Sequence, residues 1–273
     1  MDCIRIENLE IYAHHGVMQE ENVLGQKFLL SVEMETDTCA AGCSDALEHS
    51  TDYGEVAHFI KDYFETHQWK LLEAAAHHLC EQLLLQFNKI WCVNLEIKKP
   101  WAPILLPLEF VSVRVERRWH KAYLSIGSNM GDREQNLRTA LDALQADERT
   151  RVTRVSKFLV TEPVGGVEQE DFLNGAVEIA TLRTPEQLLE LVAQIEEQMG
   201  RKRTVHWGAR NIDLDIVLYE DIVMDTEKLT IPHKEMLNRQ FVLEPLCEIA
   251  PQARHPYAQM SIYQLWNAFQ QGS

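Results

Sequence analysis

Residues 210–219 read RNIDLDIVLY, and this stretch decides the fold of the second half of the chain. It is rich in strand-forming residues, and side chains alternate between the two faces of a strand. Asp213, Asp215 and Val217 therefore share one predicted face. Two carboxylates about 5 Å apart repel by roughly 3 kcal/mol at an effective dielectric near 20, so the polar face is expected to have a function. The other face is apolar and carries Ile212, Leu214, Ile216 and Leu218.

The segments around this stretch predict a β-α-β-β-α-β domain, which is the ferredoxin-like order. Two helices are expected, one opened by Asp132 with Gln135 as a capping box and one running from Thr184 to Gly200. The segment GSNMGD (127–132) lacks a Walker-type lysine, so we interpret it as a tight strand-to-helix turn. Alternating patterns predict strands at 122–128, 154–160, 172–182 and 212–219.

The first half of the chain predicts a ββααββ order with an antiparallel sheet. In KFLLSVEMET (27–36) one face is apolar, which predicts a sheet with one buried side. Helices are expected over 53–64 and 72–83, where apolar residues recur at helical spacing, and strands at 93–99 and 110–118. The fold class is therefore α+β, with domains expected at 1–118 and 121–273.

The chain is acidic, with a formal net charge of -16 over 273 residues. This charge argues against a nucleic-acid or anionic-membrane partner, because both need basic surfaces. The first residues, MDCIRIENLE, lack the basic and apolar parts of a signal peptide, so we expect a cytoplasmic protein. Cys39 and Cys43 have no second pair at zinc-ligand spacing, so we interpret the six cysteines as free thiols.

Positive charge gathers just before the paired aspartates. Guanidinium groups bind phosphates, and carboxylates bind hard cations such as Mg²⁺. The group therefore predicts a site for a nucleoside triphosphate and its metal. The alternative is a solvated loop followed by a solvated strand edge. The members of the group are Arg201, Lys202, Arg203, His206, Trp207, Arg210, Asp213 and Asp215.

The second half resembles the 6-hydroxymethyl-7,8-dihydropterin pyrophosphokinase family of folate biosynthesis over nearly its whole length. The resemblance implies magnesium-dependent transfer of pyrophosphate from ATP to the hydroxymethyl group of the pterin, with release of AMP. On this interpretation, the repulsion between the two aspartates is relieved only when magnesium and ATP bind. The matching segments are SIGSNMGDREQNL (125–137), TEPVG (161–165), DFLNGAVEI (171–179), GRKRTVHWGARNIDLDIVLY (200–219) and LTIPHKEMLNRQFVLEPLCEIAP (229–251).

The resemblance also implies individual roles. Asp213 and Asp215 match ligands of two magnesium ions, and Arg201 and Arg210 match catalytic, phosphate-binding arginines. The other residues that match the ATP-binding set are Arg203, Trp207, His233 and Arg239. Those that match the pterin-binding set are Thr161, Pro163, Val164, Phe172, Asn174 and Phe241. For the two phenylalanines and the histidine, a structural role in the core or in a turn is the alternative.

This chain departs from the family motif at three positions. His206, Ala209 and Asn211 stand where relatives usually carry arginine, proline and threonine. Loss of a proline raises the conformational freedom of a loop, and a histidine makes its charge depend on pH. We expect these departures to tune affinity without loss of activity.

The first half resembles dihydroneopterin aldolase across essentially residues 1–118. The resemblance implies retro-aldol cleavage of 7,8-dihydroneopterin, which releases glycolaldehyde and leaves 6-hydroxymethyl-7,8-dihydropterin. It implies no metal and no lysine Schiff base, because the pterin ring can accept the electrons. The matching segments are YAHHGVMQEENVLGQ (12–26), STDYGEV (50–56), LLEAAAHHLC (71–80) and IKKPWAP (97–103).

Residue by residue, Lys99 matches the catalytic lysine of the family, and Tyr53 matches a tyrosine that assists proton movement. Glu73 matches the carboxylate that binds the amino-pyrimidine edge of the pterin, a geometry with two parallel hydrogen bonds. Glu21 matches an acidic residue near the substrate side chain, and Leu72 is assigned to the same pterin-binding set. The alternative for Lys99 is a solvated lysine at the end of a strand.

The histidine pairs His14–His15 and His77–His78 invite a metal interpretation. Adjacent side chains diverge on a strand and on a helix, so neither pair chelates by itself, and we interpret them as structural or surface residues.

The family resemblance implies a tunnelling fold that assembles into tetrameric rings or stacked octamers, with active sites at subunit interfaces. The apolar segment 104–108 replaces the usual polar turn and is suited to packing against a neighbouring surface. We therefore expect a homo-oligomer formed through the first domain.

The product of the first implied reaction is the substrate of the second. We therefore expect a bifunctional enzyme of folate biosynthesis that takes small-molecule pterins and ATP. One alternative is that the first domain mainly epimerises pterins through the same retro-aldol intermediate. Another is that one domain is a non-catalytic oligomerisation scaffold.

Overall fold

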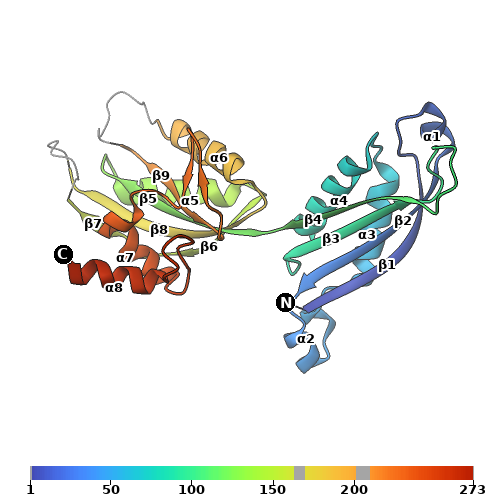
Figure 1. The fold of residues 1–273 in the computed structure, drawn as a ribbon. Coiled ribbons are helices and arrows are strands. Elements are labelled where there is room, and N and C mark those ends of the chain that lie inside the picture. The colour runs from blue at the N-terminus through green and yellow to red at the C-terminus, as the bar shows by residue number, and fades with distance from the viewer. Residues whose placement is uncertain (1, 163–169, 201–209, 273) are drawn as a thin grey trace. The chain divides into compact units, whose positions relative to one another are not determined.

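The computed structural model describes residues 2–162, 170–200 and 210–272 (Figure 1). The chain divides into two compact units, Met1–Trp119 and His120–Ser273. Across the described residues, no helix combines the length and apolar character needed to cross a membrane. All six cysteines are free, as their spacing predicts.

The first unit is a four-stranded antiparallel sheet with helices packed on one face (Figure 1). Its strands are β1 (Asp2–Ala13), β2 (Gln26–Thr36), β3 (Cys92–Lys99) and β4 (Val111–Arg118). The long helices α3 (Tyr53–Thr66) and α4 (Leu72–Gln86) connect β2 to β3. The short helix α1 (Gln19–Leu24) connects β1 to β2, and the short helices α2 (Cys39–Ser44) and η1 (Leu47–His49) lie between β2 and α3. The predicted ββααββ order is confirmed. On β2 the apolar face is fully buried and comprises Phe28, Leu30, Val32 and Met34.

The second unit has the ferredoxin-like strand order β6-β8-β5-β9, as predicted. Helices α5 (Arg133–Ala146) and α6 (Pro185–Gln198) pack on one face of the sheet. Helices α7 (Gln240–Ile249) and α8 (Ile262–Gly272) pack on the other. The strands are β5 (His120–Ser128), β6 (Thr150–Val155), β7 (Leu159–Thr161), β8 (Phe172–Thr181) and β9 (Asp213–Tyr219), with a small β10 (Met224–Asp225) and β11 (Thr230–Ile231) ribbon and the short helix η2 (Met236–Asn238).

Two strand predictions need correction. Residues 154–160 form no single strand, because β6 ends at Val155 and β7 begins at Leu159. In β9 the predicted alternation holds only to Val217, which is an extra residue in the pairing with β5. Beyond this bulge the side chains change faces, so Leu218 packs with Val217 and α7 instead of with Ile216.

The helix starts agree with the capping residues read from the sequence. Thr184 and Gln187 form a complete capping box at α6, and Gly200 follows that helix with a φ of 84°. At α5 the Asp132 side chain accepts from the Gln135 amide at 3.0 Å, but the Gln135 side chain donates to Thr139 at 3.3 Å. The predicted box at α5 is therefore only half formed.

Candidate active sites

Lys99 and Glu21 form a buried ion pair in the first unit. Each is 9% exposed, and Lys99 Nζ donates directly to Glu21 Oε1. The Glu21 carboxylate also accepts from the Met18 amide at 3.1 Å and from Gln26 Nε2 at 3.0 Å. Burial acts to raise the pKa of Glu21, but the hydrogen bonds from Lys99, Met18 and Gln26 outweigh it, and the pKa lies below its ordinary value. The pair is therefore a charged acid–base couple enclosed by protein.

The loop before α1 shapes the wall of this pair. Gly16 has a φ of 150°, and a Cβ there would meet the Glu21 carboxylate, so glycine is required. The Gly16 amide donates to the Trp69 carbonyl at 3.0 Å, and the Trp69 amide donates to His15 Nδ1 at 3.2 Å. These bonds bring the start of α4 to the same end of the sheet as Lys99. Two predicted pterin-binding residues, Leu72 and Glu73, begin that helix.

Tyr53 lies at the opposite end of the sheet. It begins α3 and is 65% exposed. Thr51, just before it, contacts Thr36 at the far end of β2, with 3.2 Å between the hydroxyl oxygens. Lys99 lies beyond the Lys98–Leu29 pair, near the start of β2. At about 3.4 Å per residue, the eight residues from Phe28 to Thr36 put roughly 27 Å between Tyr53 and Lys99 of one chain.

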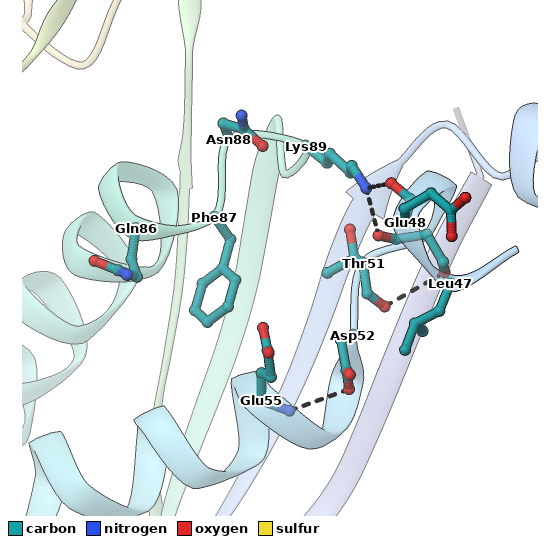
Figure 2. A pocket seen from close by; sticks show the side chains of 10 residues that line it. Leu47, Glu48, Thr51, Asp52, Glu55, Gln86, Phe87, Asn88 and Lys89 are labelled. Carbon is teal, nitrogen blue, oxygen red and sulfur yellow. Dashed lines mark hydrogen bonds between the residues drawn. The ribbon is translucent and has the colours of Figure 1, made fainter.

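A cavity of about 460 Å³ opens beside Tyr53, between the loop before α3 and the end of α4 (Figure 2). Lys89 closes one side by donating to the Glu48 and Ser50 carbonyls, the second at 2.8 Å. Asp52 caps α3 by accepting from the Glu55 amide at 3.1 Å (Figure 2). The residues that line this cavity belong to the Tyr53 end of the sheet and include neither Lys99 nor Glu21, so the cavity is separate from that pair.

The two histidine pairs have different surroundings. His15 is fully buried, with its ring centroid 4.2 Å from that of Phe64, and burial lowers its pKa to about 4. On α4, ligand atoms of His77, His78 and Glu81 lie within 4.8 Å of one another. Arg117 Nε donates to His77 Nδ1 at 3.1 Å, and a guanidinium at this nitrogen disfavours a metal cation. We retain the structural interpretation of both pairs.

In the second unit, the asparagine and the two aspartates of the predicted site lie on the sheet face that α7 covers. Gly127 on β5 pairs with Asn174 on β8 and with Asp213 on β9, and Ser125 pairs with Asp215. Directly paired residues point to the same face, so the asparagine and both aspartates lie together across three adjacent strands. A Cβ at Gly127 would meet the Asn174 side-chain oxygen, so only glycine leaves this amide its place.

The two aspartates have cationic or ionisable neighbours within the protein. Arg210 Nη1 lies 2.6 Å from Asp213 Oδ2. Burial lowers the pKa of His233, and the Asp215 carboxylate opposes part of this shift. His233 is held in place by its amide, which donates to the Val217 carbonyl at 3.0 Å. The prediction that only magnesium and ATP relieve the carboxylate repulsion is therefore wrong, because Arg210 already offsets the charge of Asp213.

The predicted pterin-binding residues also meet. Asn174 Nδ2 donates to Thr161 Oγ1 at 2.7 Å, which joins β8 to β7 at the point where the loop leaves the sheet. Phe172 is half-buried on the same face of β8, two residues before Asn174. Phe241 opens α7, and the Arg239 guanidinium lies 5.6 Å from its ring centroid. Both phenylalanines are partly buried, and Phe241 packs against the core cluster under α7, so a structural role in the core remains the alternative.

Several predicted residues lie outside the described part of the chain. They are Pro163 and Val164 of the pterin loop, and Arg201, Lys202, Arg203, His206, Trp207 and Ala209 of the basic segment. Of the three departures from the family motif, only Asn211 is described, and its side chain donates to the Met199 carbonyl at 3.0 Å. This bond ties the residue to the end of α6.

Sequence reasoning missed two buried polar residues that support the site. Glu196 on α6 is 5% exposed and accepts from the Leu214 amide at 2.8 Å, between the two aspartates. Asn129 lies in the turn after β5 and contacts the Arg210 main chain. The available signals were a glutamate beside the apolar stripe of a helix and an asparagine in a matching segment. Neither one reveals its partner, which is distant in sequence.

Fold and sites together define a two-domain enzyme, with a buried lysine–carboxylate pair in one domain and paired carboxylates beside an arginine in the other. Residues 123–251 match the 7,8-dihydro-6-hydroxymethylpterin-pyrophosphokinase family, and residues 4–116 match the dihydroneopterin aldolase family. The chain therefore belongs to both families, with one domain of each.

Individual relatives match one or both domains. The 2-amino-4-hydroxy-6-hydroxymethyldihydropteridine pyrophosphokinase of Bacillus subtilis is 50% identical over 131 residues, which cover 48% of this chain and 78% of that protein. The folic acid synthesis protein FOL1 of Dictyostelium discoideum is 31% identical over 283 residues and matches 94% of this chain. This chain spans 43% of the length of that protein and less than half of the other multifunctional relatives.

The crystal structure of E. coli dihydroneopterin aldolase in complex with neopterin is 30% identical. The match covers 43% of this chain and 99% of that chain, with a TM-score of 0.40.

Proposed function

We propose that this chain catalyses two consecutive steps of folate biosynthesis. The first domain cleaves 7,8-dihydroneopterin to glycolaldehyde and 6-hydroxymethyl-7,8-dihydropterin. The second transfers pyrophosphate from ATP to the hydroxymethyl group and releases AMP. The observation that carries the proposal is the presence of both families in one chain, since the product of the first reaction is the substrate of the second.

In the aldolase step, the Lys99–Glu21 pair moves the proton. The Glu21 carboxylate takes the proton of the side-chain hydroxyl of the substrate, the carbon–carbon bond breaks, and the pterin ring takes up the electron pair. The Lys99 ammonium then gives a proton to the carbon that stays on the ring, and the proton on Glu21 passes to Lys99 through their hydrogen bond. A buried ammonium hydrogen-bonded to a carboxylate suits this exchange, because the proton donor and the proton acceptor are in direct contact in an enclosed site. Glu73 and Leu72 bind the pterin from the start of α4.

Tyr53 joins this site from a second copy of the chain. Its distance from Lys99 within one chain, roughly 27 Å by strand length, is too great for both to contact one pterin. A ring in which the Tyr53 end of one sheet meets the Lys99 end of the next would unite them. This proposal goes with a tetramer or octamer formed through the first domain, and a light-scattering mass of one 31.6 kDa chain would refute it.

Complementation tests the shared site directly. Lys99→Ala and Tyr53→Phe chains are each expected to have little aldolase activity. Unfolding and refolding an equal mixture should restore about a quarter of the wild-type rate, because one interface in four then pairs an intact Lys99 with an intact Tyr53. A mixture as inactive as the separate variants would show that both residues act within one chain.

In the kinase step, Asp213 and Asp215 would hold magnesium together with the triphosphate of ATP. The two carboxylates fit such an ion because they project side by side from β9, at residues paired with Gly127 and Ser125. Bound there, magnesium ions, two in our proposal, would neutralise charge on the transferred and leaving phosphates.

The protein groups around them have separate tasks in this proposal. Arg210 and Arg201 bind phosphates, and Arg203, Trp207, His233 and Arg239 bind the nucleotide. Asn174, Thr161 and the loop residues Pro163 and Val164 bind the polar edge of the pterin, and Phe172 and Phe241 contact its faces. The Asn174–Thr161 hydrogen bond supports this arrangement, because it presents the amide and the loop start together.

One assay tests both activities. Dihydroneopterin, ATP and magnesium are supplied, and glycolaldehyde and AMP are followed together. Lys99→Ala should stop both products from this start but spare AMP release from added hydroxymethyl-dihydropterin. Asp213→Asn with Asp215→Asn should spare glycolaldehyde and abolish AMP. An epimerised pterin in place of glycolaldehyde would overturn the aldolase assignment, and normal AMP release by the aspartate variant would overturn the metal assignment. We also propose a cytoplasmic location.

A further inference from the structure

Asn129 occupies the turn between β5 and α5. The turn was predicted only as a connection between a strand and a helix. Asn129 is nevertheless 1% exposed, so its amide group is enclosed by protein. A buried side-chain amide has to satisfy its donors and acceptor inside the fold, and its partners therefore indicate what it holds.

Two of its hydrogen bonds clamp the main chain of Arg210. The main-chain N–H of Asn129 donates to the Arg210 carbonyl at 3.1 Å. Its side-chain Oδ1 accepts from the Arg210 amide at 2.7 Å. One residue thus fixes the peptide groups on both sides of the Arg210 Cα. This restricts the direction in which the Arg210 side chain leaves the main chain. That guanidinium is the one that pairs with Asp213.

A third hydrogen bond reaches the other side of the site. Asn129 Nδ2 donates to the Glu170 carbonyl at 3.3 Å. Glu170 is two residues before Phe172, where β8 begins. Arg133, at the start of α5, reinforces this contact by donating to the Asp171 carbonyl at 2.6 Å. One buried side chain therefore connects the Arg210 segment to the segment that leads into the pterin-binding strand.

We propose that Asn129 is a positioning residue for pyrophosphoryl transfer. It fixes the position of Arg210, on the phosphate side of the site, relative to residues 170–172, on the pterin side. The inference rests on the proposed function, because it concerns the geometry between the two substrates. Transfer needs the acceptor hydroxyl and the phosphate held within a few tenths of an ångström, and a displacement of about 1 Å can cost about 100-fold in rate.

The chemistry of the side chain supports this role. Only asparagine at this length offers an acceptor and a donor from one planar group. Aspartate keeps the acceptor for the Arg210 amide but places a second oxygen against the Glu170 carbonyl. Alanine removes both side-chain bonds and leaves the main-chain bond to Arg210. The two substitutions therefore separate the hydrogen bond to Arg210 from the hydrogen bond to Glu170.

The test is a kinetic cycle with hydroxymethyl-dihydropterin, ATP and magnesium as reactants. Asn129→Ala should lower kcat about 100-fold. In an Arg210→Ala background, the same change should lower kcat less than about threefold further, because the group it positions is gone. Asn129→Asp should keep kcat within about threefold of wild type and raise the KM for the pterin about tenfold. An alanine effect that multiplies fully with Arg210→Ala would overturn the proposal, and so would an aspartate variant with the kcat of the alanine variant.

Asn136 offers a matched control. Its Nδ2 donates to Ser128 Oγ at 3.1 Å and to the Met130 carbonyl at 2.8 Å, so it stabilises the same turn without touching Arg210 or Glu170. Asn136→Ala should change kcat less than about threefold, and its effect should multiply with that of Arg210→Ala. A loss as large as that of Asn129→Ala would mean that general loosening of the turn is responsible, and the proposal would fail.

A readout independent of activity separates this inference from the proposed function. In Asn129→Ala, hydrogen exchange at the Arg210 amide should become at least about tenfold faster, because its acceptor is lost. Exchange there should stay unchanged in Asn129→Asp and Asn136→Ala. Wild-type protein that releases no AMP would refute the proposed function alone. Unchanged exchange in Asn129→Ala would refute the positioning role of Asn129 alone.

Discussion

Replacing Lys99 by alanine should weaken the fold of the first unit as well as stop its chemistry. The side chain is half of a buried ion pair, and the two partner side chains are 11% and 9% exposed. Removing the lysine leaves Glu21 as a buried carboxylate with no cation beside it among the described residues. The variant therefore tests whether the proposed acid–base group is also a structural element.

The size of the effect follows from what remains around Glu21. Breaking a buried ion pair by removing one partner costs about 3–5 kcal/mol. Two donors remain, the Met18 amide and Gln26 Nε2, so we expect the lower end of this range, about 3 kcal/mol at pH 7. In wild type the pKa of Glu21 is depressed, so the stability that its charge contributes is present above the ordinary carboxyl pKa and is lost as the pH falls.

Without Lys99, burial raises the pKa of Glu21, and the carboxyl takes up a proton on folding. Folding of the variant is then favoured at low pH, and stability is lost as the pH rises through the raised pKa. The difference between wild type and variant should consequently shrink between pH 7 and pH 4.5. This trend distinguishes a buried charge from a cavity left by the missing side chain, which would cost the same at both values.

Amide hydrogen exchange of the full chain is the suitable assay. Protection of β3 amides reports the opening of the first unit, and protection of β8 amides in the second unit serves as an internal reference. Lys99→Ala should reduce protection of β3 by about 3 kcal/mol and leave β8 unchanged. Glycolaldehyde release, measured on the same samples, should fall below detection.

Two further variants complete the test. Lys99→Ala with Glu21→Gln should recover all but about 1 kcal/mol, without recovering activity. Gln26 can accommodate the new amide, because its Oε1 is buried without a partner among the described atoms. Lys98→Ala is the control, since Lys98 Nζ donates to Asn8 Oδ1 at 3.1 Å and lies 3.7 Å from Glu96 and 5.3 Å from the Phe110 ring centroid, and it should cost less than about 1 kcal/mol. The reasoning is refuted if the double variant is no more stable than Lys99→Ala.

Three other predictions follow from single contacts. His15, with its pKa lowered to about 4, should cost the first unit about 3 kcal/mol of stability as the pH falls from 6.5 to 4, and His15→Gln should flatten this slope in urea unfolding. Gly127→Ala should displace the Asn174 amide and weaken pterin binding about tenfold in calorimetry, with ATP binding unchanged. Arg210→Gln should tighten Mn²⁺ binding without nucleotide roughly tenfold, measured by water proton relaxation, because it removes the cation beside Asp213.

The strand patterns predicted most of the fold because burial has a regular period. In β2, every second residue from Phe28 to Met34 is apolar and fully buried, so the alternation by itself predicts which face of the strand is buried. The bulge at Val217 was not predictable in this way, because Ile216, Val217, Leu218 and Tyr219 are all apolar. When the side chains change faces in such a run, the hydrophobic pattern of the sequence stays the same. Only the pairing with β5 shows the extra residue.

The candidate sites were predictable in composition and less so in geometry. Alternation places Asp213 and Asp215 side by side, and the pairing with β5 agrees with it. The partners of these groups are not periodic. Asn129 is 81 positions from Arg210, and Lys99 is 78 from Glu21, so a local pattern cannot indicate either contact. Tyr53 shows the same limit, because the sequence predicts the helix that it begins but not that this helix starts at the end of the sheet opposite Lys99.

The position of Arg210 changes how the paired aspartates can be understood. The repulsion between the two adjacent carboxylates was expected to be relieved only when magnesium and ATP bind. Instead Arg210 holds Asp213, and Asp215 lies within electrostatic reach of His233. A guanidinium has five N–H donors, so Arg210 can keep one edge on the carboxylate and present the other to a phosphate. In the proposed function, the arginine that offsets the charge of Asp213 is also the one that binds the triphosphate, and the two Asn129 hydrogen bonds to its main chain would hold it for that task.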